Sequence, residues 1–220
     1  MEILLALFIL AGSYVIGSIP FGLIVVRLRS GKDIRQVESG RTGGTNAMRA
    51  AGFWAGFATA VLDLLKASVT VWIARFILPE AVWLQVLAPI MAILGHNYSI
   101  FLAERGADGR LHLRGGAGGA PSVGGAFGLW PASILIIIPL GLLVLFGIGY
   151  ASLATLSVAV LATAIFALRA WSGSAPWAYV FYGILAFFIL AYALLPNIKR
   201  LLNGTERMVG WRARRQNQGK

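Results

Sequence analysis

The sequence contains no cysteine and few charged residues for its length. Without cysteine the chain can form no disulfide and can use no thiolate as a nucleophile or metal ligand. Only 12% of the 220 residues are charged, whereas 58% are hydrophobic, and the mean hydropathy is +0.78. Soluble domains do not have this balance, and apolar runs of about 20 residues are long enough to cross a bilayer. The sequence therefore predicts an integral membrane protein.

Acidic residues are also scarce, with 8 Asp and Glu against 19 Lys and Arg and a formal net charge of +11. In a soluble protein this excess would point to nucleic acid. Here the basic residues flank apolar segments, which is typical of residues that set membrane topology and contact anionic headgroups. We therefore expect membrane lipids as partners and no nucleic acid.

Several catalytic motifs are missing as well. The sequence has no HExxH, no Cys/His ligand cluster, no GxxxxGK[ST] and no GxSxG. The absence of these motifs gives no support to a metal hydrolase, a nucleotide hydrolase or a serine hydrolase. We also expect no metal site.

The apolar and basic segments alternate in a way that predicts topology. The apolar segments cover about 3–26, 53–78, 82–102, 118–168 and 177–195, and the basic ones cover 27–50, 104–116 and the C-terminal tail. The positive-inside rule places all three basic segments in the cytoplasm, so the chain must cross an even number of times between them. Pro131 supplies the required break in the fourth apolar segment and predicts helices at 118–130, 132–148 and 152–168.

This parity argument predicts an all-α membrane protein with about seven transmembrane helices, its N-terminus outside and its C-terminus cytoplasmic. The first helix has no signal-peptide pattern, and we expect it to be retained. The helix at 118–130 would rise only about 20 Å, which is short of a bilayer core of about 30 Å. We expect one transmembrane domain over 1–206 and a basic tail over 207–220 that lies on anionic lipid.

Residues 38–49, ESGRTGGTNAMR, are the most polar stretch between the first two apolar segments. Glycines free the backbone to aim N–H groups at one point, and arginines add the forked donors that suit phosphate. The candidate residues are Ser39, Gly40, Arg41, Thr45, Asn46 and Arg49. A flexible loop with an ordinary helix cap is the other interpretation.

A second glycine-rich run precedes the short helix. Gly115, Gly116 and Gly118 follow Arg114, and a glycine-rich turn at a helix N-terminus can hold a phosphate. The alternative is a turn in which glycine only permits close helix packing.

Five further residues, in three segments, carry polar side chains that could contribute. Asp63 and Lys66 are three residues apart in a predicted helix, so they share a face and can pair. A structural ion pair is as good an explanation for them as a role at a site. His96 lies near the cytoplasmic end of the next helix, where hydrogen-bonded packing is the commoner role. Asn197 and Glu206 belong to the C-terminal NIKRLLNGTER, which could equally be a basic membrane anchor.

Taken together, the motifs resemble the PlsY family of bacterial acyl-phosphate:glycerol-3-phosphate acyltransferases. The resemblance covers nearly the whole chain and rests on GSIPFG, DIR, SGRTGGTNAMR, DLLK, GHNYSIF, RGGAGG and NIKRLLNGTE in this order and context. It implies a seven-helix membrane enzyme of phospholipid synthesis in the bacterial inner membrane, with its active site facing the cytoplasm.

The implied reaction joins a fatty acyl phosphate to the sn-1 hydroxyl of glycerol 3-phosphate and gives lysophosphatidic acid and phosphate. No coenzyme A, acyl carrier protein or metal is implied. By position, Ser39, Arg49 and Asn197 match catalytic residues of the family. Substrate or phosphate binding is implied or expected for Gly40, Arg41, Thr45, Asn46, Lys66, His96, Arg114, Gly115, Gly116, Gly118 and Glu206.

The chain departs from the family pattern at a few positions. Ala117 stands where the family has a lysine, and Leu194 where it has a histidine. Arg41 replaces an asparagine and could restore the lost charge. Two other interpretations stay open: a PlsY-like protein that binds a phosphorylated lipid without catalysis, and a transporter of an organic phosphate.

Overall fold

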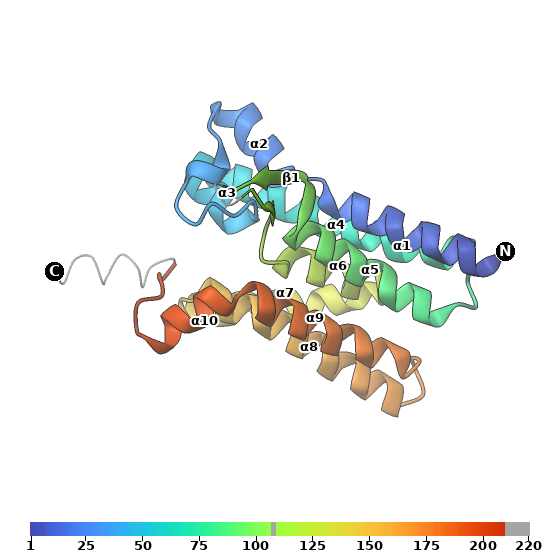
Figure 1. Ribbon diagram of the computed structural model, residues 1–220. Coiled ribbons are helices and arrows are strands. Elements are labelled where there is room, and N and C mark those ends of the chain that lie inside the picture. The colour runs from blue at the N-terminus through green and yellow to red at the C-terminus, as the bar shows by residue number, and fades with distance from the viewer. Residues whose placement is uncertain (107–108, 210–220) are drawn as a thin grey trace.

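The long apolar runs of the sequence form a bundle of helices, with a β-hairpin at one end (Figure 1). The computed structural model describes residues 1–106 and 109–209. The helices are α1 (Glu2–Ser18), α2 (Phe21–Ser30), α3 (Gly44–Ala51), α4 (Phe53–Ile77), α5 (Val82–Asn97), α6 (Gly119–Leu129), α7 (Ile134–Ile148), α8 (Ala151–Trp171), α9 (Ala178–Ala193) and α10 (Leu195–Leu202). Two 3₁₀ turns, η1 (Ile34–Gln36) and η2 (Pro131–Ser133), and the antiparallel strands β1 (Ser99–Arg105) and β2 (Leu111–Arg114) complete the described elements.

Four helical stretches among the described residues are long and apolar enough to cross a membrane. They cover Glu2–Ser30, Phe53–Ile77, Pro131–Ile148 and Ala151–Trp171. Helices α9 and α10 would form a fifth span, but they are bent by 68° at their junction. The helix α5 is apolar but shorter, and α6 has only 11 residues. The predicted break at Pro131 is confirmed, because α6 ends at Leu129 and η2 begins at that proline.

Two predicted helices differ from the observed ones. The first apolar segment is not continuous: α1 ends at Ser18, and α2 starts after Pro20. Proline lacks the N–H that a continuing helix needs, and it restricts the residue before it. The third segment, predicted over 82–102, is helical only to Asn97.

The residues that follow α5 form the β-hairpin, which the all-α prediction missed. Ile100 and Phe101 favour an extended strand, since branched and aromatic side chains pack well on a pleated surface. Leu102 is buried, while Ile100 and Phe101 are exposed. The hairpin is held to the bundle by Ser99, whose hydroxyl donates to the carbonyl of Ser18 at 2.6 Å.

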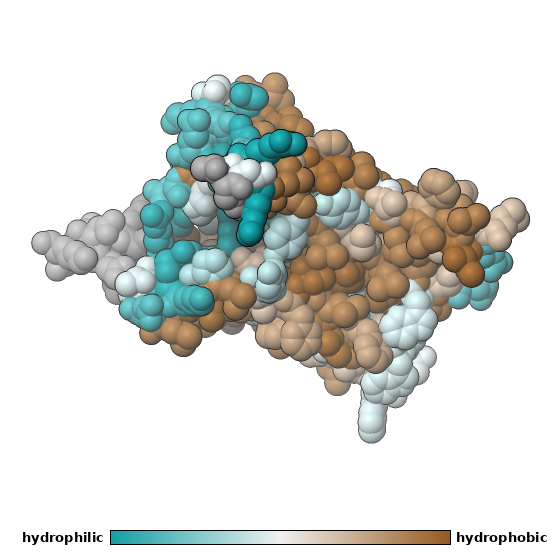
Figure 2. Space-filling view, in the orientation of Figure 1, coloured by the Kyte–Doolittle hydropathy of each residue, from teal (hydrophilic) through white to brown (hydrophobic). Residues whose placement is uncertain are grey.

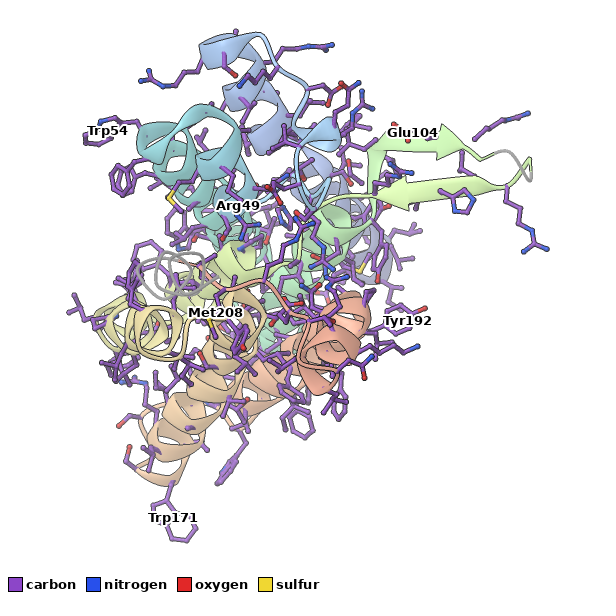
Figure 3. The ribbon with its side chains drawn as sticks, turned by 90° about the vertical axis from the view of Figure 1, so that its left-hand side faces the viewer. Arg49, Trp54, Glu104, Trp171, Tyr192 and Met208 are labelled. Carbon is purple, nitrogen blue, oxygen red and sulfur yellow. The ribbon has the colours of Figure 1, made fainter. Side chains whose placement is uncertain are left out.

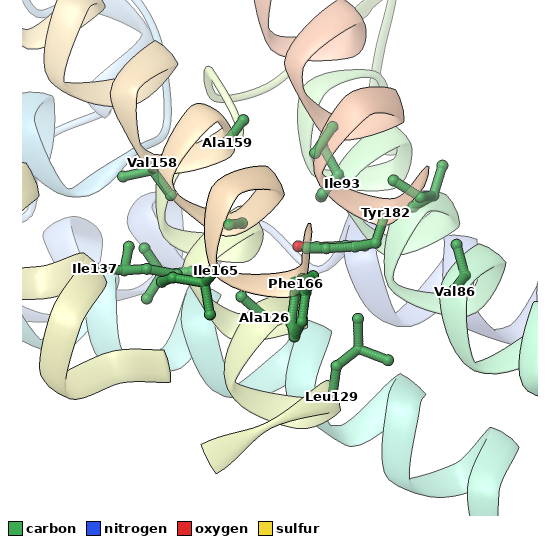
Figure 4. Close-up of a cluster of buried hydrophobic side chains, with 14 of the residues drawn as sticks. Val86, Ile93, Ala126, Leu129, Ile137, Val158, Ala159, Ile165, Phe166 and Tyr182 are labelled. Carbon is green, nitrogen blue, oxygen red and sulfur yellow. The ribbon is translucent and has the colours of Figure 1, made fainter. Parts of the chain in front are cut away.

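The main hydrophobic core lies where α5, α6, α7, α8 and α9 meet (Figure 4). Phe166 and Tyr182 are fully buried there, with ring centroids 6.3 Å apart in an edge-to-face arrangement. The Tyr182 hydroxyl donates to the Ser122 carbonyl at 2.6 Å, so its polar atom is satisfied inside the core. This contact fixes α9 against α6.

The α4–α6 contact is equally close. A Cβ on Gly124 would overlap the Leu64 carbonyl, and the Ser68 hydroxyl donates to the Gly124 carbonyl at 2.8 Å. Small residues of this kind let helices approach in a membrane, where the hydrophobic effect does not drive them together. The start of α6 is thereby held beside α4.

Hydrophilic residues gather at one end of the molecule, over α2, α3, the hairpin and α10 (Figure 2). The rest of the visible surface is largely hydrophobic along the helices (Figure 2). In the loop before α3, Arg35 binds Asp33 at 2.6 Å and Glu104 of β1 at 2.7 Å. The hydrogen bond from Arg35 lowers the pKa of Asp33 to about 2. These ion pairs join the loop to the hairpin beside the site.

Candidate active site

The hydrophilic end contains a cavity of about 590 Å³, the main cavity, between α3, α6, α8 and α10. Figure 3 looks onto this end, with Arg49 and Met208 near the centre of the view. The main cavity is lined by Glu38, Ser39, Arg41, Gly43, Gly44, Thr45, Asn46, Arg49, Ala60, Asp63, His96, Ala117, Gly118, Gly119, Ala120, Ala151, Ser152, Thr155, Leu194, Pro196, Asn197, Arg200, Glu206 and Arg207.

Four helices contribute their first turns to this cavity. The residues are Gly44 and Thr45 of α3, Gly119 and Ala120 of α6, Ala151 and Ser152 of α8, and Pro196 and Asn197 of α10. The first N–H groups of a helix have no partner within it, and they carry a partial positive charge. The N-termini of α3, α6 and α8, together with arginine side chains, make the cavity suited to anions. At α10, Pro196 has no N–H, and the Asn197 N–H already donates to the Leu194 carbonyl at 2.8 Å.

Arg49 and Arg41 supply full positive charges. Arg49 lies in the last turn of α3 and forms no ion pair within the described ranges. Arg41 reaches across to α9, where its Nη2 donates to the Ala193 carbonyl at 2.8 Å. Burial lowers the pKa of the Arg41 guanidinium, and the nearby Arg200 cation acts in the same direction. An anion beside Arg41 would offset both effects.

The loop that carries Ser39 and Arg41 is fixed by Asn46. The Asn46 Nδ2 lies 3.2, 2.9 and 2.9 Å from the carbonyls of Ile34, Val37 and Arg41, respectively. Its Oδ1 is buried and has no hydrogen-bond partner in the described part of the chain. The predicted binding residue Asn46 therefore lines the cavity, and its amide nitrogen orders the loop.

The glycine-rich turn packs against this loop and against His96. The Gly116 N–H donates to the His96 carbonyl at 3.0 Å, and the Thr42 N–H donates to the Gly115 carbonyl at 3.3 Å. A Cβ on Gly116 would overlap the His96 ring. Gly118 adopts a φ of 85° as the residue before α6, which favours glycine. Close packing accounts for the need for glycine here.

Beneath the main cavity, Asp63, Lys66 and His96 form a buried group. The Lys66 Nζ lies 2.7 Å from Asp63 Oδ1, 3.0 Å from His96 Nδ1 and 2.9 Å from the Ile19 carbonyl. The predicted Asp63–Lys66 pair is confirmed. An ammonium has three N–H donors, so these partners satisfy Lys66, and it lines neither cavity. In this respect Lys66 differs from its predicted role in phosphate binding.

The C-terminal motif closes another side of the main cavity. The Asn197 Nδ2 donates to Glu206 Oε1 at 2.6 Å, and Arg200 Nε binds Glu206 Oε2 at 3.0 Å. Glu206 thus holds Asn197 in place, while the Asn197 Oδ1 stays buried without a partner among the described residues. Arg207 pairs with Glu38 and so joins the start of the predicted tail to the opposite loop. Residues 210–220 of that tail lie outside the described residues.

A second space, the side cavity of about 250 Å³, adjoins the first. It is lined by Ser39, Gly40, Arg41, Asn97, Tyr98, Leu113, Arg114, Gly115, Gly116 and Ala193. Ser39 and Arg41 line both cavities. The structure therefore brings the predicted site residues together around the two cavities, with Lys66 as the exception.

Several lining residues were missed from the sequence. Ser152 and Thr155 belong to a segment predicted only as an apolar span, and Asn97 follows His96 at the end of another. Ser152 and Thr155 belong to no motif, and Asn97 lies in GHNYSIF but carries no signal that separates it from its neighbours there. Ala117 and Leu194 also line the main cavity, and the Arg41 guanidinium is bonded to the residue next to Leu194.

Comparisons with known proteins agree with this architecture. The profile of the family described as glycerol-3-phosphate acyltransferase matches residues 7–204. A glycerol-3-phosphate acyltransferase of Thermus thermophilus is 37% identical over 202 residues, covering 91% of this chain and 94% of the relative. One of Chlorobium phaeobacteroides is 31% identical, covering 91% and 95%.

The structure is similar to crystal structures of PlsY, an integral membrane glycerol 3-phosphate acyltransferase. The glycerol 3-phosphate form matches with a TM-score of 0.78 and 30% identity, covering 93% of this chain and 96% of PlsY. The lysophosphatidic acid form matches with a TM-score of 0.76 and 28% identity.

Proposed function

The chain belongs to the glycerol-3-phosphate acyltransferase family, and we propose that it transfers a fatty acyl group from an acyl phosphate to the sn-1 hydroxyl of glycerol 3-phosphate. The products are lysophosphatidic acid and inorganic phosphate. The observation that carries this proposal is the main cavity, where the N-termini of α3, α6 and α8 meet Arg41 and Arg49. Both substrates and lysophosphatidic acid carry a phosphate group, and the other product is inorganic phosphate, so such a cavity suits every anionic group of the reaction.

The reaction needs positioning more than a strong base. The acceptor hydroxyl oxygen attacks the carbonyl carbon of the acyl phosphate, and the bond from that carbon to the bridging phosphate oxygen breaks. The hydroxyl proton ends on the released phosphate, so no proton has to be stored on the protein. In this scheme the helix N-termini and Arg49 stabilise the charge that develops on the leaving phosphate. Ser39 and Asn197 orient the acceptor through its hydroxyls.

We also propose the family's topology, with seven crossings, the N-terminus outside and the cavity facing the cytoplasm of a bacterial inner membrane. The segment 27–50, the described residues 104–106 and 109–116, and α10, which carries Lys199 and Arg200, all lie at the cavity end (Figures 1 and 2). The positive-inside rule assigns that end to the cytoplasm. The short helix α6 crosses only part of the bilayer, because it starts at the main cavity.

The test is phosphate release by the purified full-length chain, given palmitoyl phosphate with and without glycerol 3-phosphate. We expect acceptor-dependent release that falls at least a hundredfold in Arg49→Ala, since a charge-assisted contact is lost in the transition state. The matched control is Arg29→Ala, an exposed arginine on α2 that lines neither cavity.

Other outcomes would identify the two alternatives. Tight glycerol 3-phosphate binding without any release would contradict the proposed catalysis and favour a binding protein. Efflux of glycerol 3-phosphate from loaded proteoliposomes, without acyl transfer, would favour a transporter.

A further inference from the structure

The side cavity contains a polar side chain for which the fold supplies no partner. Asn97 is 4% exposed, and both its Nδ2 and its Oδ1 lack hydrogen bonds within the described residues. A buried amide without partners costs free energy, and an apolar residue of the same shape would avoid that cost. Asn97 lines the side cavity, so a molecule that enters this cavity is the available acceptor for its Nδ2. Its Oδ1 lies on the side of Gly118.

The charges around the side cavity favour an anion. Arg41 and Arg114 line it, and no lining residue is acidic. A guanidinium has five N–H donors, whereas Arg41 uses one on the Ala193 carbonyl. Arg114 also lies 3.6 Å from Glu104 on its exposed side.

The C-terminal ends of α5 and α9 lie at the side cavity. Their carbonyl groups carry a partial negative charge, which disfavours an anion there. The partial charge of a helix terminus is about half of one unit, and Arg41 already meets the end of α9. The full charges of the two arginines therefore prevail. Burial lowers the pKa of Arg41, which is the direction expected of a cation without an anionic partner.

We propose that the side cavity is a second anion site, which binds a phosphate group on Arg41 and Asn97 beside the main cavity. This inference rests on the proposed function, in which the substrates and the released product carry phosphate. The cavity volume of about 250 Å³ leaves room for several waters beside the anion, because one water occupies about 30 Å³.

Two sources share this chemistry: inorganic phosphate released by acyl transfer, and the phosphate head of glycerol 3-phosphate. Ser39 and Arg41 line both cavities. A phosphate released in the main cavity can thus reach the side cavity while it remains in contact with the same arginine.

The experiment measures the thermal unfolding midpoint of the detergent-solubilised full chain in titrations with inorganic phosphate, with glycerol 3-phosphate, and with phosphate at saturating glycerol 3-phosphate. The variants are Asn97→Leu, which removes the polar atoms, and Asn97→Asp, which keeps the shape and adds a negative charge. Arg29→Gln, at an exposed position outside both cavities, is the control at matched ionic strength.

For the unchanged chain we expect phosphate to raise the midpoint further at saturating glycerol 3-phosphate. The apparent dissociation constant of phosphate should rise at least tenfold in Asn97→Leu and more in Asn97→Asp. Without any phosphate, Asn97→Leu should unfold at the same or a higher temperature, because two unpaired buried atoms are gone. Asn97→Leu keeps the test valid if Asn97→Asp does not fold.

If the apparent dissociation constant of glycerol 3-phosphate rises in the variants instead, the same anion site holds the phosphate group of that substrate. If neither constant changes in either variant, the inference is overturned. A chain that glycerol 3-phosphate does not stabilise in any form contradicts the proposed function, and the titration with inorganic phosphate alone still tests the side cavity.

Discussion

At the end of the bundle away from the main cavity, Arg75 of α4 is enclosed by acceptors. Its Nη2 donates to the Leu129 carbonyl at 3.1 Å, and its Nε lies 3.3 Å from Gln85 Oε1. Tyr179 donates to the same Gln85 oxygen at 2.8 Å, and Gln85 Nε2 donates to the Pro79 carbonyl at 2.8 Å. This network is complete within the protein.

The cavity end contains polar groups that the protein leaves incomplete. Asn97 and Ser152 have no side-chain partners in the described ranges, and the Asn46 and Asn197 Oδ1 atoms have none either. All four residues line one of the two cavities. The hydroxyls of Thr59, Ser122 and Ser133 and the Arg169 Nε are also unpaired, but these residues line neither cavity. A closed network stabilises the fold, whereas a cluster of unpaired groups around a cavity is what a polar ligand requires.

Removing the ammonium of Lys66 should produce the largest effect, because it leaves the buried Asp63 carboxylate without its cation. Lys66→Met leaves Asp63 without its 2.7 Å partner in the membrane region. Loss of one member of a buried ion pair costs about 3–5 kcal/mol. We expect a strongly lowered unfolding midpoint in detergent. The double variant Lys66→Met/Asp63→Leu should recover much of that loss, and an equally low midpoint for both would refute a structural pair.

Gly116→Ala should damage the site more than Gly43→Ala, although both glycines belong to the predicted phosphate loops. A Cβ on Gly116 overlaps the His96 ring, whereas a Cβ on Gly43 meets nothing within 4 Å. Overpacking costs about 1–3 kcal/mol, so we expect roughly a tenfold to hundredfold loss of kcat/KM in Gly116→Ala. Steady-state kinetics with glycerol 3-phosphate measure it. Similar losses in both variants would show that backbone freedom, and not close packing, requires these glycines.

The sequence predicted the elements that depend on local pattern. The helical spans follow from apolar length, the break at Pro131 from a missing N–H, and the Asp63–Lys66 pair from their spacing on one helix. The site residues proposed from the family resemblance, other than Lys66, line the two cavities. That family is confirmed by its profile match over 7–204.

The features that the sequence did not predict depend on contacts between segments that are far apart in the chain. Arg41 and Ala193 are 152 residues apart, and no sequence pattern links a loop arginine to the end of α9. Residues 99–102 of the first strand were predicted as helix, because they continue the apolar run of α5. Asn97 has no distinguishing neighbour in the sequence, and only its missing partners in the fold single it out.

Arg41→Asn should lower turnover by about tenfold to a hundredfold, which is the value of one charge-assisted contact. Arg41 is the cation that lines both cavities beside Leu194, while Ala117 provides no charge. The acyl transfer assay measures this loss, with Arg29→Asn as the exposed control. Near-normal turnover would contradict the idea that Arg41 compensates for the apolar residues at positions 117 and 194.

Arg75→Met tests the complete network, and its effect on catalysis should be the smallest. The variant removes donors from the Leu129 carbonyl and from Gln85, but Gln85 and Tyr179 remain hydrogen-bonded to each other. We expect a loss of stability of about 1–3 kcal/mol from the unpaired carbonyl, seen as a lower unfolding midpoint. The KM for glycerol 3-phosphate should not change, because Arg75 lines neither cavity. A raised KM with an unchanged midpoint would mean that the two ends are coupled through α4, and that the far network serves the site as well as the fold.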